Sequence, residues 1–356
     1  MSLSGEVIAA IEDAIDAGVS PGAVCIIGRG DETLCHEAVG DRALKPQRLP
    51  MEPDTVFDAA SVTKPVATTT VVMALAEDGV LSVDDPVSRW LPEFTGEGRA
   101  GVTVRHLLTH TSGLPAYRDY PAMWGDEVPP EERRARVVAD LAAGALAYAP
   151  GEDSVYSCLG FILLASVVEA ASGRPLAELA DERVFGPLGM RDSCFCPPPE
   201  MSERCAATEE LPEGVLQGVV HDQNARYLGG VGGNAGLFTT AGDLARFARA
   251  ILRGGELDGA RVLGEDSVEA VMTEYPAPGE VRRTLGWRLA NSSDVHLHGA
   301  PAAESVGHTG FTGTCLWVDP ASGLYVILLT NRVHMGRDAE IEPLRRRVGE
   351  IAAGLV

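Results

Sequence analysis

The sequence predicts an α+β fold with an antiparallel sheet formed from both termini, flanked by terminal helices, and an inserted, mostly helical lobe. Strand patterns gather near both ends of the chain, and the patterns between them have helical periodicity with few strands. The chain has 356 residues, more than one hydrophobic core usually fills, so two lobes are expected. Strands from both ends can share one sheet while the middle supplies the helices.

Near the N-terminus, apolar residues at helical spacing predict a helix before two paired strands, and near the C-terminus three strands precede a helix. These terminal elements are expected at residues 7–15 (helix), 22–28 and 33–39 (strands), 285–289, 314–318 and 324–330 (strands), and 341–353 (helix). The run DPASG at 319–323 predicts the turn between the last two strands.

The middle of the chain has apolar residues three or four positions apart, which is the spacing of helices that pack on a core. The predicted helices span residues 62–77, 104–109, 130–143, 159–171 and 241–252. We therefore expect residues 1–60 and 280–356 to form the sheet lobe and residues 61–279 the inserted helical lobe. An active site is expected between the two lobes.

The formal net charge of −22 argues against nucleic acid or an anionic membrane as a partner, because phosphates would be repelled over most of the surface. No apolar run reaches the roughly 18 residues of a membrane span. The first residues lack the pattern of a signal peptide, so a cytoplasmic location is expected unless a native leader has been trimmed. Nothing in the sequence predicts the oligomeric state.

Only two of the 29 basic residues are lysines, Lys45 and Lys64, and Lys64 follows Ser61 by three positions. A buried lysine can serve as a titratable amine, whereas an arginine stays protonated. Residues three apart share one face of a helix, so the Ser61 hydroxyl and the Lys64 amine can come within hydrogen-bond distance. The alternative is a serine N-cap followed by chance by a lysine, and the pair alone does not decide between them.

The helix after Ser61 is apolar nearly all round, which predicts a buried central helix with Ser61 at its N-terminus. Free amide groups and the positive end of the helix dipole favour an oxyanion there. Pro65 removes the amide that would have bonded back to the Ser61 carbonyl. This position suits a nucleophile.

Two more motifs follow in order, Tyr156-Ser-Cys158 and His308-Thr-Gly310. With Ser61-x-x-Lys64 they resemble the serine beta-lactamase and penicillin-binding protein superfamily, in which S-x-x-K, Y-x-N and K-T-G line one cleft. The best local match is the class C-like branch of esterases and D-amino-acid peptidases, and the likeness runs from about residue 22 to about residue 331. The resemblance implies a beta-lactamase/transpeptidase-like fold.

By this resemblance, Ser61 is the nucleophile that forms an acyl-enzyme, and Lys64 with Tyr156 removes its proton and later activates water. A nearby ammonium is expected to lower the pKa of the Tyr156 phenol, and the two groups would titrate together. The backbone amides of Ser61 and Phe311 would form the oxyanion hole.

The resemblance also implies the substrate-binding residues, and two of them depart from the family pattern. Thr309 and Gly310 match it. Cys158 stands where the family has asparagine, so a weak thiol replaces an amide donor and acceptor. His308 stands where the family has lysine, so a group that is mostly neutral at pH 7 replaces a fixed cation. Asn234, in a glycine-rich loop, is a further candidate for the cleft.

Both departures favour neutral esters, so the expected function is a carboxylesterase on small esters. The alternatives are a beta-lactamase, a D-alanyl-D-alanine carboxypeptidase or D-aminopeptidase, an acyltransferase, or a penicillin-binding protein without turnover. The expected partner is thus a small-molecule ester or amide. No metal or organic cofactor is implied, because the protein supplies nucleophile, base and oxyanion donors. His106 and His110 are expected to be structural, since the chain has no G-x-S-x-G elbow.

Overall fold

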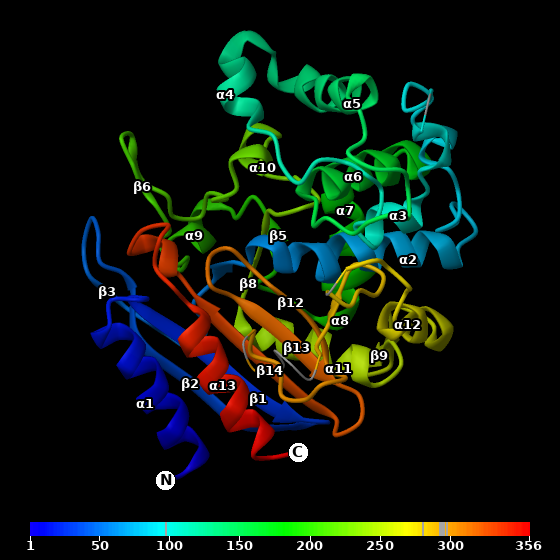
Figure 1. Ribbon diagram of the computed structural model, residues 1–356. Helices are drawn as coiled ribbons and strands as arrows, with labels where there is room; N and C mark the ends of the chain where they lie inside the picture. Colours follow the sequence, from blue (N-terminus) through cyan, green and yellow to red (C-terminus); the bar gives the residue numbers. More distant parts are fainter. Residues whose placement is uncertain (97, 280, 292–295, 297) are drawn as a thin grey trace.

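The computed structural model describes residues 1–96, 98–279, 281–291, 296 and 298–356 (Figure 1). Its main sheet is antiparallel, with strand order β11-β12-β13-β14-β1-β2-β3. The strands are β1 (Gly22–Arg29), β2 (Glu32–Ala43), β3 (Leu49–Pro50), β11 (Arg288–Leu289), β12 (Val306–Thr309), β13 (Cys315–Asp319) and β14 (Leu324–Thr330). The predicted antiparallel sheet from both termini is confirmed, because β1 pairs with β14 in the register Ile26↔Ile327.

Two terminal helices, α1 (Leu3–Asp16) and α13 (Glu342–Ala353), lie side by side on one face of this sheet (Figure 1). Their apolar residues pack with the sheet in one cluster, which includes Ile11, Trp317 and Val348. The opposite face packs on α11 (Ala241–Leu252) and the other inserted helices. Since both faces are covered, β14 is buried along its whole length.

The segment between the two parts of the sheet is mainly helical, as predicted. Its α-helices are α2 (Thr70–Glu77), α3 (Val104–Leu108), α4 (Tyr120–Trp124), α5 (Arg133–Ala143), α6 (Cys158–Ser172), α7 (Leu176–Ala180), α8 (Gly186–Leu188), α9 (Pro199–Ser202), α10 (Gln223–Tyr227), α11 and α12 (Glu265–Met272). Short strand pairs or triplets interrupt them: β4 (Phe57–Asp58), β8 (Leu237–Thr239) and β5 (Cys194–Phe195); β6 (Glu210–Leu211) and β7 (Gly214–Val215); β9 (Glu256–Leu257) and β10 (Ala260–Arg261).

The predicted helix at 62–77 is confirmed as one helical segment with an irregular start. A 3₁₀ turn, η1 (Ala60–Val62), leads into a π-helical stretch, η2 (Lys64–Thr69), and then into α2. Pro65 lacks the amide hydrogen that an α-helical turn would use as a donor. The Pro65 carbonyl accepts a hydrogen bond of 3.0 Å from the Thr70 hydroxyl. Such π-helical stretches occur often at functional sites.

The strand predicted at 285–289 is shorter in the structure, where only β11 forms. Gly286 has a φ of 77°, which breaks the extended conformation. A Cβ atom at this position would lie 1.9 Å from the Thr69 hydroxyl oxygen, so the chain approaches the central helical segment closely here. The predicted lobe boundary at residue 280 lies outside the described residues, and the division into lobes stays a prediction.

Among the described residues, no single helix is both long and apolar enough to cross a membrane. One pair of helices, Cys158–Ser172 with Leu176–Leu188, passes the same test of length and composition together but is bent by 82°. Most of α6 is buried inside the protein, as expected for a core helix.

Candidate active site

A cleft of about 610 Å³ lies beside β12 and the start of the central helical segment. Most residues singled out from the sequence line it together, although they come from distant parts of the chain. The lining includes Ser61, Tyr156, Cys158, His308, Thr309, Gly310 and Phe311. Lys64 is fully buried directly behind Ser61.

Ser61 follows a strained residue. Ala60 has a φ of 48°, which is uncommon for a residue other than glycine. The buried carboxylate of Asp58 holds this conformation, because its Oδ1 accepts a hydrogen bond of 2.8 Å from the Ala60 amide. The resulting turn directs Ser61 into the cleft, and such local strain is typical of functional sites.

The Lys64 ammonium has three donor hydrogens and contacts three acceptors. Its Nζ lies 3.0 Å from Ser61 Oγ and 2.9 Å from the backbone oxygen of Asn234. The third contact, at 3.7 Å, is with Cys158 Sγ. The predicted proximity of the Ser61 hydroxyl and the Lys64 amine is therefore present in the structure.

Tyr156 lies beside Lys64. The Lys64 Nζ atom is 4.9 Å from the centroid of the Tyr156 ring. The His110 ring packs against it with centroids 4.6 Å apart, and His110 Nδ1 accepts a hydrogen bond of 3.1 Å from the Ser157 amide. His110 thus positions the tyrosine, while His106 closes a capping box with Thr103 at the start of α3.

The pKa values of the Tyr156–Lys64 pair are set by burial and by each other. Burial raises the pKa of Tyr156, and the Lys64 ammonium lowers it, with a net upward direction. For Lys64, burial lowers the pKa, but Cys158 and Tyr156 together raise it by more than burial lowers it. The net direction of the Lys64 pKa is therefore also upward. The lowering of the phenol pKa by the ammonium is therefore present but outweighed by burial. At neutral pH the pair holds both protons.

The predicted oxyanion donor Phe311 lies on a turn that is held from two sides. Within the described part of the chain, the Phe311 amide makes no hydrogen bond. The preceding amide, that of Gly310, donates a hydrogen bond of 2.7 Å to the Thr314 carbonyl. Arg345 donates to the carbonyls of Gly310, Gly313 and Thr314, and Arg332 Nε donates to the Phe311 carbonyl at 2.8 Å. These bonds leave the Phe311 amide available to an oxyanion.

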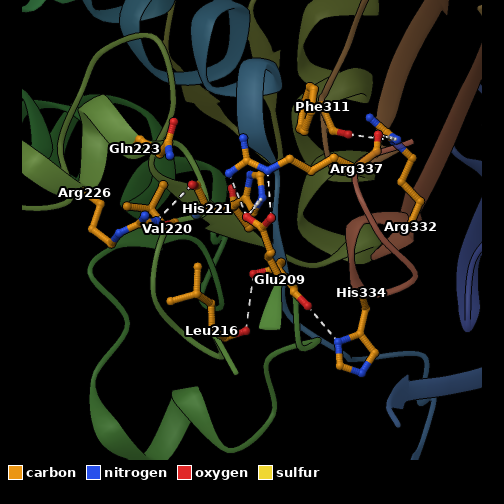
Figure 2. Close-up of polar contacts among 12 residues, drawn as sticks. Glu209, Leu216, Val220, His221, Gln223, Arg226, Phe311, Arg332, His334 and Arg337 are labelled. Atoms are coloured by element: carbon orange, nitrogen blue, oxygen red, sulfur yellow. Dashed lines mark hydrogen bonds and ion pairs between the residues drawn. The ribbon is translucent and has the colours of Figure 1, made fainter. Parts of the chain in front are cut away.

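Phe311 is 47% exposed at the cleft, and its ring contacts two side chains. The His221 ring stacks on one side at 5.6 Å between centroids, and the Arg332 guanidinium lies 4.7 Å from the centroid. Figure 2 shows that His221 in turn contacts Glu209, which accepts two hydrogen bonds from Arg337. This network fixes the rim of the cleft.

His308 is buried in β12 and does not replace the cation of the family motif. Burial, with the charges of Lys64 and two arginines, lowers the pKa of His308 well below its usual range. Its Nδ1 donates to the Thr309 carbonyl at 2.8 Å. His308 is therefore neutral at pH 7, as the sequence indicated.

Cys158 and Asn234 both contact the Lys64 ammonium. Cys158 faces the cleft, at the first position of α6. Asn234 is fully buried and reaches Lys64 through its backbone carbonyl, while its side-chain amide has no hydrogen-bond partner among the described residues. Asn234 thus reaches the site only through its backbone oxygen, which contacts Lys64.

Several residues at the site were not indicated by the motifs, among them Arg345, Arg283, His221 and Arg332. For Arg345 a signal existed, because the helical pattern of 341–353 places this charged residue beside Leu344 on the buried face. Arg283, His221 and Arg332 offered none, because only the folded chain brings them to the cleft.

The family model described as Beta-lactamase matches residues 7–350 of this chain. A Bacillus subtilis (strain 168) protein named N-acetylmuramyl-L-alanine amidase is 32% identical over 356 residues, 91% of this chain and 80% of that protein. An Escherichia coli (strain K12) protein named "Putative D-alanyl-D-alanine carboxypeptidase" is 30% identical over 304 residues, 79% of this chain and 70% of its own length.

Solved structures agree with this likeness. The structure titled "EstCE1, a hydrolase with promiscuous acyltransferase activity" has a TM-score of 0.75 and 25% identity, and covers 97% of this chain and 98% of its own. A penicillin-binding protein homologue from Caulobacter crescentus has a TM-score of 0.80 with 23% identity, covering 100% of this chain and 98% of that one. The second match shows the fold alone.

Proposed function

Because this chain belongs to the Beta-lactamase family, and thus to its serine hydrolases, we propose that it cleaves small carboxylic esters through an acyl-enzyme on Ser61. One observation carries the proposal: the buried Lys64 amine lies 3.0 Å from Ser61 Oγ and beside the Tyr156 ring, at a cleft where a neutral histidine replaces the family cation. The solved hydrolase of similar fold, which has promiscuous acyltransferase activity, supports the chemistry of a hydrolase that transfers acyl groups.

In the proposed reaction, the Tyr156–Lys64 pair first loses one of its two protons to solvent. Ser61 Oγ then attacks the ester carbonyl while its proton passes to the pair. The oxyanion accepts hydrogen bonds from the amides of Ser61 and Phe311. Collapse of the tetrahedral intermediate breaks the bond to the alcohol, which takes the proton and leaves the acyl group on Ser61. Water then loses a proton to the same pair, attacks the acyl carbon and releases the acid.

A second candidate is cleavage of an amide or beta-lactam, which the names of the two curated relatives favour. The nucleophile would be the same. Cys158 weighs against this candidate, because a thiol is a poor partner for a substrate amide. Cys158→Asn should raise acylation by the beta-lactam nitrocefin about tenfold if one amide hydrogen bond is restored. Unchanged nitrocefin acylation in this variant would contradict the role given to Cys158.

The deciding experiment compares initial rates on p-nitrophenyl butyrate and on nitrocefin. Ser61→Ala is the control for both substrates, and its melting temperature shows whether the fold is retained. A Ser61-dependent preference for the ester supports the esterase. A Ser61-dependent preference for nitrocefin would move the protein to the second candidate, and an active, folded Ser61→Ala variant would exclude the nucleophile.

A further inference from the structure

Asp58 is the last residue of β4 and lies three positions before Ser61. It is 2% exposed, and among the described residues its carboxylate forms no ion pair. Both oxygens instead accept a hydrogen bond from a backbone amide, Oδ1 from Ala60 at 2.8 Å and Oδ2 from His221 at 2.7 Å. A buried carboxylate is costly unless such bonds compensate it, so each amide is held tightly.

The first of these bonds acts on the nucleophile. Ala60 directly precedes Ser61, and its φ of 48° needs support from its surroundings. The bond from the Ala60 amide to Asp58 Oδ1 supplies that support. The direction of the Ser61 amide, one of the two proposed oxyanion donors, therefore depends on the Asp58 carboxylate.

The second bond acts on the other proposed oxyanion donor, the Phe311 amide. The His221 ring stacks on the Phe311 ring with centroids 5.6 Å apart and planes 16° apart. Arg226 Nη1 donates to the His221 carbonyl at 2.9 Å, which holds this loop in place (Figure 2). The Asp58 carbonyl also accepts a hydrogen bond of 2.9 Å from the hydroxyl of Thr312, next to Phe311. Asp58 thus contacts both segments that carry oxyanion donors.

We propose that Asp58 is a positioning residue for the reaction at Ser61: its carboxylate holds the Ser61 and Phe311 amides in place together, and one proton on it disables the oxyanion hole. This inference rests on the nucleophile and the oxyanion donors of the proposed function. Protonation turns one carboxylate oxygen into a hydroxyl, which is a donor and a weaker acceptor. Because both oxygens already accept an amide hydrogen bond, one of the two bonds must weaken.

The surroundings of the carboxylate place this protonation at weakly acidic pH. Burial raises the pKa of Asp58 to about 6, and the hydrogen bonds from the His221 and Ala60 amides lower it. Of the charged neighbours at α10, Asp222 raises the pKa and Arg226 lowers it. The group is therefore mostly ionised at pH 7 and mostly protonated at pH 5.

The other neighbours of Asp58 do not change charge together with it. Burial raises the pKa of the Cys205 thiol to about 12, and the adjacent Arg204 is already in an ion pair. On β8, the residue opposite Asp58 is the apolar Phe238. The His221 ring is the rival titrating group, since burial lowers its pKa as well, and a variant at Asp58 distinguishes the two.

The fold should survive this protonation. The folded pKa of about 6 lies above the unfolded value of about 3.9, so the native state binds this proton more tightly than the unfolded chain does. The stability that Asp58 contributes is fully present below about pH 4 and is lost as pH rises through about 6. Acid should thus disable the site without unfolding the protein through this group.

The test is a stoichiometric reaction with diethyl p-nitrophenyl phosphate, which does not depend on the substrate class. Ser61 Oγ bonds to phosphorus, p-nitrophenolate leaves, and the hydroxyl proton passes to the Tyr156–Lys64 pair. Peptide mass spectrometry gives the second-order rate constant k from about pH 5 to about pH 8. The slope of log k against pH should be about 1 above pH 6.5, where only the pair must lose a proton, and should approach about 2 below pH 5.5, where Asp58 must lose one too.

Asp58→Asn imposes the neutral state at every pH. Its amide group keeps one acceptor oxygen but turns a second donor toward a backbone amide. The value of k at pH 7 should fall about 100-fold, as for loss of one oxyanion donor, and the slope should stay near 1 down to about pH 5.

Asp243→Asn is the matched control. Asp243 is also buried, at 8% exposed, and its Oδ2 accepts a hydrogen bond of 2.8 Å from the Asp192 amide, but it does not line the described cleft. Because neither oxyanion amide depends on it, k should stay within about threefold of wild type and the slope should still approach about 2 at low pH.

The wild-type profile alone can overturn the proposal, even if Asp58→Asn does not fold. A slope of about 1 down to pH 5, with circular dichroism showing an intact fold, would do so. A slope of about 2 that persists in Asp58→Asn would also do so, because the His221 ring or another group would then be the one that titrates. A folded Asp58→Asn protein with the wild-type k at pH 7 would exclude the positioning role.

Failure of the proposed function would look different. A wild type that turns over neither p-nitrophenyl butyrate nor nitrocefin, yet shows both slopes in the phosphorylation of Ser61, would defeat the hydrolase and leave the role of Asp58 intact. Phosphorylation that is unchanged in Ser61→Ala would defeat both, because the reacting group would not be Ser61.

Discussion

The Tyr156–Lys64 pair keeps its protons although both groups are buried. Lys64 has no exposed surface, yet its ammonium is kept by Ser61 Oγ, the Asn234 carbonyl and the thiol of Cys158. Tyr156, in turn, keeps its proton because burial raises its pKa more than the ammonium lowers it. The resting site is therefore a phenol beside an ammonium, and it must lose one proton before it can accept one from Ser61.

This state predicts the pH dependence of the reaction. Both pKa values are shifted upward, so the pair is fully protonated at neutral pH. The form that has lost one proton therefore becomes more abundant as pH rises. The Ser61-dependent kcat/KM for p-nitrophenyl butyrate should increase from about pH 6 to about pH 9, with an apparent pKa that belongs to the pair. Rates of the Ser61→Ala variant are subtracted at each pH. A kcat/KM that falls over this range would contradict the assignment of the base.

At the residue scale, the sequence indicated the motif residues and little else. Ser61, Lys64 and Tyr156 were identified because they occur at fixed spacing and in a fixed order. The packing of the His110 ring against Tyr156 has no such spacing. Motifs indicate candidate residues, whereas contacts between distant segments become visible only in the folded chain.

At the scale of elements, the oxyanion turn depends on a close approach of two segments. The segment between β12 and β13 contacts the chain two residues before Ser61, because Thr314 Oγ1 donates a hydrogen bond of 3.0 Å to the Ala59 carbonyl. A Cβ atom on Gly310 would lie 2.1 Å from Thr314 Oγ1 and 2.6 Å from the Ala59 oxygen. The absence of a side chain at Gly310 thus keeps the two proposed oxyanion amides on one side of the cleft.

Gly310→Ala should therefore displace the turn. We expect kcat/KM to fall about 100-fold, as for loss of one oxyanion donor. Overpacking should also lower the free energy of unfolding by about 1–3 kcal/mol. Gly101→Ala is the control, because a Cβ atom there has no neighbour within 4 Å. Steady-state kinetics and urea unfolding measure both effects, and a Gly310→Ala variant with wild-type kcat/KM would show that the turn is not held as described.

The long elements followed the sequence closely. The helix predicted at 241–252 and the strand predicted at 324–330 have the predicted bounds, because each has a strong apolar period and a clear turn beside it. The irregular elements did not. The π-helical start at Lys64 and the shortened strand after Gly286 are set by contacts with distant segments, which local patterns do not contain.

At the scale of the whole molecule, two electrostatic effects oppose each other. The net charge is −22, so the excess negative charges repel one another. This repulsion destabilises the compact state, and salt screens it. Exposed ion pairs such as Lys45–Glu210 and Arg261–Glu256 are stabilising and are also screened, but such pairs contribute only about 0–1 kcal/mol each. We therefore expect the repulsion to dominate.

The melting temperature should accordingly rise by a few degrees when NaCl is increased from about 20 mM to about 300 mM at pH 7. The rise should shrink near the isoelectric point of about 4.7, where the net charge vanishes. Differential scanning calorimetry at the two pH values measures this. A melting temperature that falls with NaCl at pH 7 would mean that the ion pairs outweigh the repulsion.

The most direct test of the central claim is a mass measurement of the acyl-enzyme. The protein is mixed with p-nitrophenyl butyrate, quenched in acid within the first turnovers, digested and analysed by peptide mass spectrometry. We predict a butyryl group on Ser61, absent from the Ser61→Ala protein. A butyryl group on Cys158 instead, or turnover with no acylated peptide, would contradict the assignment of Ser61 as the nucleophile.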